Sequence, residues 1–335
     1  MITIKEVTTR KTLKKFVDFQ NILYKDSPYY VPGLRMDEIN TLRKDKNTAF
    51  EYCDTIFFLA YQNEVIVGRI GVILSHKSNE KWGQRNARFT HFDFIDDFEV
   101  SKALMDSAEA WAKIRNLEKL HGPLGFTDMD HQGMLVEGFE EQDMMITIYN
   151  YPYYIDHMTK LGYEKDADWV EYQVTLPSAP VEKITRVSAL VKRRYDLRLI
   201  EFTNKKEIMP WAKPVFQLLN EAYSPLYGSV LLSDKQIDDY VKTNFGFVNP
   251  DFIKIVVDRD DQLVGFAITM PSLSKSVQKS RGRLLPFGFI PILRAIKKND
   301  ILDLYLIAVK PELQGLGINA IMIESLAESA RNYGI

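Results

Sequence analysis

The chain has 335 residues, of which 46% are hydrophobic and 26% are charged, and its formal net charge at pH 7 is −2. These values are typical of a globular protein large enough for two domains. They give no general attraction to nucleic acid or to an anionic membrane. The single cysteine, Cys53, excludes an internal disulfide, and no apolar run reaches the roughly 18 residues of a membrane span. We therefore expect a cytoplasmic protein without a nucleic-acid partner, and a membrane partner is not favoured.

The first half of the chain predicts a series of strands and helices, from the spacing of its apolar residues. In chain order these are a strand over 2–7, a helix over 12–24, a hairpin over 56–71, a strand over 87–95, a helix over 99–115, a strand over 119–127 and a helix over 153–163.

The second half predicts the same order again, which indicates a tandem repeat. Its elements are a strand over 197–202, a helix over 210–223, a hairpin over 253–268, a strand over 301–309 and a helix from 318 onward. The two hairpins align without a gap when Gly68 is placed over Gly265. Two prolines between 176 and 181 predict a stiff linker. We expect domains over 1–176 and 197–335, joined by a linker and a connecting helix over 177–196.

A strand, a glycine turn and a helix follow one another near the end of the sequence. Pro311 cannot continue the strand over 301–309 because it has no N–H group. Gly315 and Gly317 then form a tight turn, and apolar residues from Ile318 onward recur at helical spacing. The first N–H groups of a helix lack partners and favour negative charge, so this order predicts a site for a pyrophosphate.

Spacing separates the kinds of phosphate site that share this order. A P-loop requires a Lys and then Ser or Thr after its last glycine, whereas Ile318 and Asn319 follow Gly317 here. A dinucleotide fingerprint, G-x-G-x-x-A, is formally present at Gly315, Gly317 and Ala320. Its first glycine should follow the strand directly, but residues 310–314 intervene, so this match is weak.

The segment 309–319, Val-Lys-Pro-Glu-Leu-Gln-Gly-Leu-Gly-Ile-Asn, resembles the acyl-CoA-binding motif of the GCN5-related N-acetyltransferases, the GNAT superfamily. Asn319 departs from the Gly or Ala that is usual at its position. The resemblance implies two tandem GNAT-like folds of α/β class with mixed sheets, and acetyl-CoA or another acyl-CoA as co-substrate. It also implies that backbone groups of the strand bond the pantetheine and those of the turn bond the pyrophosphate. The residues concerned are Ile307, Val309, Gln314, Gly315, Leu316, Gly317, Ile318 and Asn319.

The reaction implied by the resemblance is acyl transfer to an amine, which must lose a proton to a base or to a water relay. Asp303 lies on the strand where several members of the family carry a carboxylate base. Tyr305, on the same strand face, is a second catalytic candidate. Asp303 could instead face solvent or bond a neighbouring strand. The acceptor, a small-molecule or peptide amine, is not indicated. The rival interpretation is a non-catalytic protein, either acyl-CoA-binding or structural.

The two halves differ in their chemistry. In place of the glycine turn, the first half has the acidic segment 95–100, which would repel a pyrophosphate. Met158 stands where the family often has a Tyr that protonates the leaving thiolate. We therefore expect the first half to have a structural role or to shape an acceptor pocket. The second half stops at Ile335, so we expect an incomplete sheet that another element or chain completes, as in an oligomer.

Residues 262–299 contain no Asp or Glu, but they contain several Lys and Arg between 275 and 298 around an apolar stretch. This basic insertion could be a lid over an anionic or fatty ligand, or a solvated excursion, and membrane contact is the least favoured interpretation. Asp128, Asp130 and His131 do not have the spacing of a recognised metal site. We expect no metal.

Overall fold

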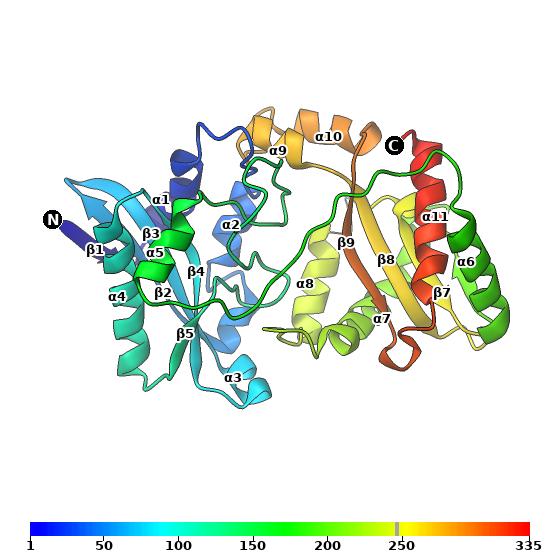
Figure 1. Cartoon of the computed structure of the whole chain (residues 1–335), viewed down its shortest axis with the longest axis horizontal. Helices are drawn as coiled ribbons and strands as arrows, with labels where there is room; N and C mark the ends of the chain where they lie inside the picture. Colours follow the sequence, from blue (N-terminus) through cyan, green and yellow to red (C-terminus); the bar gives the residue numbers. More distant parts are fainter. Residues whose placement is uncertain (245–247) are drawn as a thin grey trace. The chain divides into compact units, whose positions relative to one another are not determined.

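The computed structural model of the chain describes residues 1–244 and 248–335. The chain folds into two compact units, each built around its own sheet (Figure 1). Unit 1 contains Met1–Val170, Tyr227–Val230 and Leu273–Ile292, and unit 2 contains Glu171–Leu226, Leu231–Ser272 and Leu293–Ile335. Two segments from the second half of the sequence therefore belong to unit 1.

Unit 1 has a five-stranded sheet with the order β1-β2-β3-β4-β5, in which only the β4–β5 pair is parallel. The strands are β1 (Ile2–Glu6), β2 (Cys53–Gln62), β3 (Val65–Ser75), β4 (Asn86–Phe94) and β5 (Lys119–His121). The helices are α1 (Arg10–Leu23), α2 (Arg35–Thr41), α3 (His76–Trp82), α4 (Phe98–Ile114), α5 (Tyr153–Lys160) and α9 (Ser274–Ser280).

The sheet of unit 1 is covered on both faces, because successive residues of a strand point to opposite sides. Ile70 and Val72 of β3 pack in the same core as Leu104 of α4. Ile73 of β3 packs instead in the core that contains Phe16 of α1. The result is a sheet between two helical layers, which matches the apolar pattern of the hairpin strands.

Unit 2 has a four-stranded antiparallel sheet with the order β6-β7-β8-β9. The strands are β6 (Arg198–Ile200), β7 (Ile253–Val257), β8 (Leu263–Pro271) and β9 (Leu302–Val309). The helices are α6 (Glu182–Tyr195), α7 (Lys205–Tyr223), α8 (Asp234–Asn244) and α11 (Ile318–Tyr333), and α10 (Phe289–Lys297) begins in a segment of unit 1. No helix within 1–244 or 248–335 is both long enough and apolar enough to cross a membrane.

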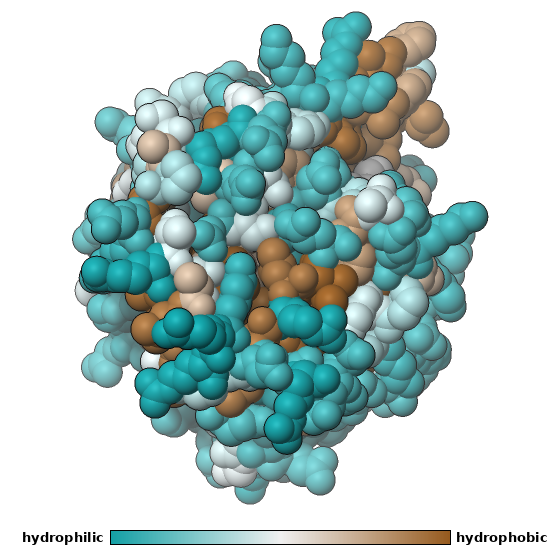
Figure 2. All heavy atoms as spheres, turned by 90° about the vertical axis from the view of Figure 1, so that its right-hand side faces the viewer, coloured by the Kyte–Doolittle hydropathy of each residue, from teal (hydrophilic) through white to brown (hydrophobic). Residues whose placement is uncertain are grey.

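Helices α6 and α11 cover one face of this sheet. Ile321 and Met322 of α11 are fully buried against Val256 of β7 and Val191 of α6. The side of unit 2 that carries α6 and α11 is mostly hydrophilic, with hydrophobic side chains gathered in small groups (Figure 2). The apolar side of α11 is buried in the core of unit 2, and this packing fixes the position of its first turn.

The prediction of two α/β units is confirmed, and both predicted hairpins form, as β2–β3 and β7–β8. Strand β5 is shorter than the predicted strand over 119–127, because Pro123 has no N–H to donate and Gly122 has a positive φ of 149°. Helix α7 begins before the predicted residue 210, since Asn204 caps it by accepting a hydrogen bond from the N–H of Lys206.

Candidate functional site

The glycine turn in unit 2 leads from β9 into α11 through a short 3-10 helix, Pro311–Leu313. Gly315 and Gly317 have φ angles of 76° and 86°, a region that residues with a side chain rarely adopt. A Cβ atom on Gly317 would lie 3.1 Å from Val187 and 3.4 Å from Val191, both on α6. The turn therefore needs glycine for its backbone conformation and for its close approach to α6.

The backbone N–H groups from Gly315 through Asn319 lie at the start of α11 and have no acceptor in the part of the chain that the structure describes. Gly317 is the N-cap of α11 and provides no side-chain hydrogen bond to the helix. Among the described residues, none accepts a hydrogen bond from the N–H groups of Gly315 through Asn319. The N–H of Gln314 is engaged with the carbonyl of Pro311 at 3.3 Å. Free N–H groups at the positive end of a helix can bind an anion.

The corresponding turn of unit 1 has the opposite character. Asp97 caps α4, and its carboxylate accepts a hydrogen bond of 3.0 Å from the N–H of Glu99. The carboxylate of Asp96 lies 3.1 Å from Nε2 of His157. A negative side chain thus occupies the place at α4 where α11 leaves its N–H groups open.

Asp303 and Tyr305 lie on β9, as predicted, and both are removed from solvent to a large degree. Asp303 is 4% exposed. Burial raises the pKa of its carboxyl to about 6, although a hydrogen bond with Ser272 lowers that pKa and the charge of Glu171 raises it. Within the described residues, the hydroxyl of Tyr305 and one oxygen of Asp303 are buried without a hydrogen-bond partner.

The strand residues expected to bond pantetheine are partly engaged within unit 2. The carbonyl of Ile307 accepts a hydrogen bond of 3.1 Å from the hydroxyl of Tyr223 on α7. The carbonyl of Val309 accepts one of 3.1 Å from the side-chain amide of Gln314. A carbonyl oxygen has two lone pairs, so a further donor can still bond to either group.

Unit 1 contains a second group of polar side chains, which the sequence analysis missed. We call this group the polar cluster, and its members are Tyr30, Glu38, His91, Asp130, His131 and Asp143. They come from the segment between α1 and α2, from α2, from β4 and from the loops that follow β5.

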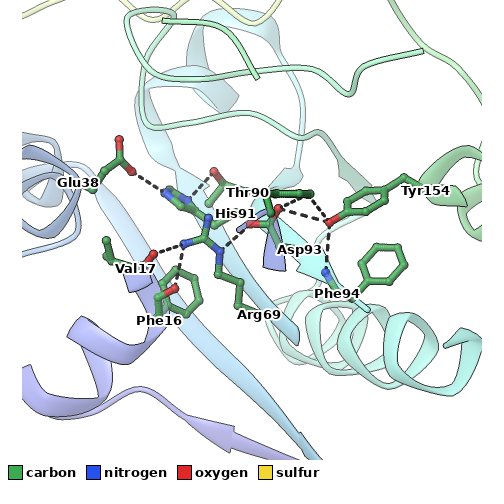
Figure 3. Close-up of polar contacts among 10 residues, drawn as sticks. Phe16, Val17, Glu38, Arg69, Thr90, His91, Asp93, Phe94 and Tyr154 are labelled. Carbon is green, nitrogen blue, oxygen red and sulfur yellow. Dashed lines mark hydrogen bonds and ion pairs between the residues drawn. The ribbon is translucent and has the colours of Figure 1, made fainter. Parts of the chain in front are cut away.

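His91 is placed by an irregularity in β4. Arg69 of β3 pairs with Asp93 and Gly71 pairs with Thr90, so β4 has an extra residue between these points. His91 has a φ of 47° within this bulge. Its Nδ1 lies 3.0 Å from the Thr90 hydroxyl and its Nε2 lies 3.6 Å from the carboxylate of Glu38 (Figure 3). The bulge thus points an imidazole toward a carboxylate.

The carboxylates of the cluster have unusual acidities. Burial alone would raise the pKa of Glu38, but its hydrogen bond with His91 and the charges of His131, His91 and Arg69 lower that pKa to about 2. Burial raises the pKa of Asp143 to about 6, against the opposing effect of its hydrogen bond with the Thr147 hydroxyl. Glu38 is therefore ionised throughout the physiological range.

An ion pair lies beside the cluster and supports the bulge. Arg69 Nε is 2.6 Å from Asp93 Oδ2, and the same guanidinium donates to the carbonyl of Phe16 at 2.9 Å (Figure 3). The hydroxyl of Tyr24 donates to the other oxygen of Asp93 at 2.9 Å and lies 2.6 Å from the hydroxyl of Tyr154. These contacts tie β3, β4, α1 and α5 together.

Sequence spacing gave little signal for the polar cluster, because its members are spread from Tyr30 to Asp143. The segment 128–131 suggested at most a metal site. In the part of the chain that the structure describes, no group of three or more His, Cys, Asp and Glu is placed to hold a metal.

Two known proteins are similar to the chain over most of its length. Protein YghO of Escherichia coli (strain K12) is 25% identical over 337 aligned positions, which cover 98% of this chain and 84% of that protein. The bacterial ceramide synthase of Caulobacter vibrioides (strain NA1000 / CB15N) is 22% identical over 315 positions, which cover 90% of this chain and 78% of that protein. No protein-family model matches the chain.

Two solved structures to which the chain is similar over its whole length are named as GNAT or GCN5-related proteins. A tandem GNAT protein from the clavulanic acid biosynthesis pathway has a TM-score of 0.48 and 11% identity, over 100% of this chain and 87% of that chain. A GCN5-related glucosamine N-acetyltransferase region of a fungal β-N-acetylglucosaminidase has a TM-score of 0.49 and 10% identity, over 100% of this chain and 34% of that chain.

The two units of the chain repeat one order of elements. Each unit places a strand, helices, a hairpin, a strand and a helix in the predicted sequence. This is the order that the resemblance of segment 309–319 to the GNAT motif implies.

Proposed function

We propose that the protein is an acyl-CoA-dependent N-acyltransferase that binds acyl-CoA at the turn before α11. The single observation that carries the proposal is the run of free N–H groups from Gly315 through Asn319 at the start of a helix. A pyrophosphate needs such donors, and the positive end of the helix dipole favours its charge. Acetyl-CoA is the first candidate, and longer acyl-CoA molecules share the same pyrophosphate.

The proposed reaction is direct transfer. The amine nitrogen attacks the thioester carbonyl carbon, the C–S bond breaks, and an amide and the CoA thiolate form. Asp303, with a pKa of about 6, is ionised at neutral pH and is the proposed acceptor for the proton that the amine loses. The unpaired hydroxyl of Tyr305 is the proposed donor to the developing negative charge.

The acceptor that we propose to test first is a long-chain amino alcohol. The similar protein from Caulobacter vibrioides is named a ceramide synthase, and a ceramide forms by N-acylation of such an amine. This choice places a small-molecule amine ahead of a peptide amine.

The test of binding uses a charge change that leaves the fold intact. Asn319→Asp puts a carboxylate beside the proposed pyrophosphate site, and an acidic residue in the first turn of a helix favours the helix. Asn332→Asp makes the same change near the other end of α11, as a matched control. In calorimetric titrations with CoA and acetyl-CoA, we expect Asn319→Asp to weaken binding about tenfold or more, since it removes roughly 1.4 kcal/mol. Asn332→Asp should bind as the unaltered protein does.

The site is wrong if the unaltered protein and Asn319→Asp bind CoA equally well, or if neither binds it. Thiol release from acetyl-CoA and longer acyl-CoA in the presence of sphinganine then separates an enzyme from the rival, a binding protein without catalysis. Asp303→Asn should retain CoA binding and lose thiol release. Binding without thiol release for any amine would favour the rival.

A further inference from the structure

The polar cluster of unit 1 has no part in the acyl-CoA site proposed for unit 2. It brings together carboxylates and imidazoles around a bulge in β4, and it includes the hydroxyl of Tyr30, which has no hydrogen-bond partner among the described residues. A buried hydroxyl without a partner has a cost, so the cluster requires an explanation of its own.

The polar cluster contains three carboxylates and two imidazoles. Glu38 is ionised, because its pKa is lowered to about 2 by His91, His131 and Arg69 against the effect of burial. The positive charge of Arg69 is balanced by Asp93, which lies 2.6 Å away. His131 donates from Nε2 to the carbonyl of Met145 at 3.1 Å, so this nitrogen is not available as an acceptor. The ionised carboxylate of Glu38 favours a cationic ligand.

Tyr30 provides the second, independent observation. Its side chain is 6% exposed, and its hydroxyl has no hydrogen-bond partner among the described residues. Burial raises the pKa of this hydroxyl, and the charges of Arg69, Asp93, Glu38 and Asp143 act on it. A buried hydroxyl without a partner is uncommon in a folded protein and is explained by a group that the chain itself does not supply.

Two members of the polar cluster reach the surface of unit 1. The Glu38 side chain is 25% exposed and the His91 side chain is 19% exposed. Both side chains are therefore partly open to solvent.

Helix α9, which comes from the second half of the sequence, holds the loops that carry Tyr30 and Asp143. The side-chain amide of Gln278 donates to the carbonyls of Pro28 and Tyr30, at 2.9 Å each. The N–H of Met145 donates to the hydroxyl of Ser274 at 3.1 Å. These bonds fix the backbone on two sides of the cluster before any ligand arrives, which lowers the entropic cost of binding.

We propose that the polar cluster binds the ammonium group of a primary amine, with the carboxylate of Glu38 as its principal acceptor and the hydroxyl of Tyr30 as a further partner. An ammonium offers three N–H donors, and a cluster of carboxylate and phenol oxygens can accept them. The proposal concerns unit 1 alone and does not depend on the function proposed for unit 2.

The experiment uses hexylamine as the probe and 1-hexanol as its uncharged counterpart, with the full-length chain and without acyl-CoA. Histidine ring signals are followed by NMR during each titration. Hexylamine should shift the signals of His91 and His131, and 1-hexanol should not. Glu38→Gln should weaken hexylamine binding about tenfold or more, as the loss of a charged hydrogen bond predicts. Glu137→Gln, a change at an exposed residue of unit 1, should leave binding unchanged.

Tyr30→Phe separates a ligand-binding role from a structural one. Its hydroxyl bonds to no protein group among the described residues, so its removal should not lower the unfolding temperature, yet it should weaken hexylamine binding. The proposal is overturned if hexylamine causes no shift in the unaltered protein, if 1-hexanol binds equally well, or if Glu38→Gln binds as tightly as Glu137→Gln. Because CoA is absent, these outcomes are independent of the Asn319→Asp titration.

Discussion

Arg69 and Asp93 form an ion pair inside unit 1, where their side chains are only 2% and 7% exposed. Tyr24 and Tyr154 satisfy the second oxygen of Asp93, and Phe16 accepts from the guanidinium. A buried pair of this kind contributes little net stability against an apolar alternative, but the loss of one partner leaves the other charge buried alone. The pair therefore makes the bulge of β4 sensitive to single substitutions.

Asp93→Asn should destabilise unit 1 by about 3–5 kcal/mol, because Arg69 loses its counter-charge. Denaturant unfolding followed by circular dichroism measures this loss. Asp106→Asn removes one partner of an exposed pair with Lys102 and should cost less than about 1 kcal/mol. Equal effects of the two substitutions would contradict the account of the buried pair.

His121 gives a pH dependence with a defined sign. Burial lowers its pKa from 6.5 to about 4, and the charges of Arg88 and Lys119 lower it further while Asp166 raises it. The unfolded chain therefore binds this proton at a higher pH than the folded chain does. The contribution of neutral His121 to stability is present above pH 6.5 and is lost as the pH falls toward 4.

Denaturant unfolding of the unaltered chain and of His121→Gln between pH 7 and pH 4 tests this assignment. The unaltered chain should lose more stability over that range than the variant, since glutamine does not titrate. Parallel pH profiles would show that His121 is not the group responsible.

At the level of elements, the docking of α9 onto unit 1 depends on the backbone at Gly282. The N–H of Arg35 donates to the carbonyl of Gly282 at 2.8 Å. Gly282 has a φ of 70°, and a Cβ atom there would collide with the carbonyl oxygen of Gly33. This contact joins the segment after α9 to the segment before α2.

Gly282→Ala should release this segment and speed tryptic cleavage at Arg281 and Arg283. Gly162→Ala is the matched control, because Gly162 also has a positive φ, 83°, but a Cβ atom there meets nothing within 4 Å. Both variants carry the strain of a positive φ, of roughly 1 kcal/mol. Only Gly282→Ala should change the cleavage rate, and similar rates for both variants would show that close packing at Gly282 is unimportant.

In the whole molecule, neither unit is one continuous stretch of the sequence, because each unit consists of three separate segments. The chain leaves unit 1 after Val170, enters unit 2, and returns to unit 1 for the segments Tyr227–Val230 and Leu273–Ile292. Trp82 and Lys81 of α3 donate hydrogen bonds to Ser229 within unit 1. Unit 1 is thus completed by residues that lie far along the sequence.

A protease site placed between Tyr172 and Val174, which are 82% and 81% exposed, tests this arrangement. The two fragments should elute together in gel filtration without denaturant, because the second fragment carries segments of unit 1. They should separate in urea. Separation without urea would show that these segments do not hold unit 1 together.

Most of the elements were predictable from local sequence. The hairpins, the connecting helix and the strand before α11 each have an apolar period that their own residues set, and α6 lies within the segment expected to connect the two domains. Two single residues moved the bounds of other elements away from the predicted positions. Pro123 ended β5 early, and Asn204 started α7 before the predicted position.

The sequence by itself determined the glycine turn, because a strand, two glycines and a helix N-terminus are contiguous, and the first N–H groups of a helix have no acceptor within the helix. The tertiary structure alone decided the polar cluster and the docking of α9. Tyr30, Glu38, His91 and Asp143 become neighbours only when a bulged strand, helix α2 and two loops meet. No periodic pattern of the sequence predicts that these residues are neighbours, since they share neither a helix face nor a strand.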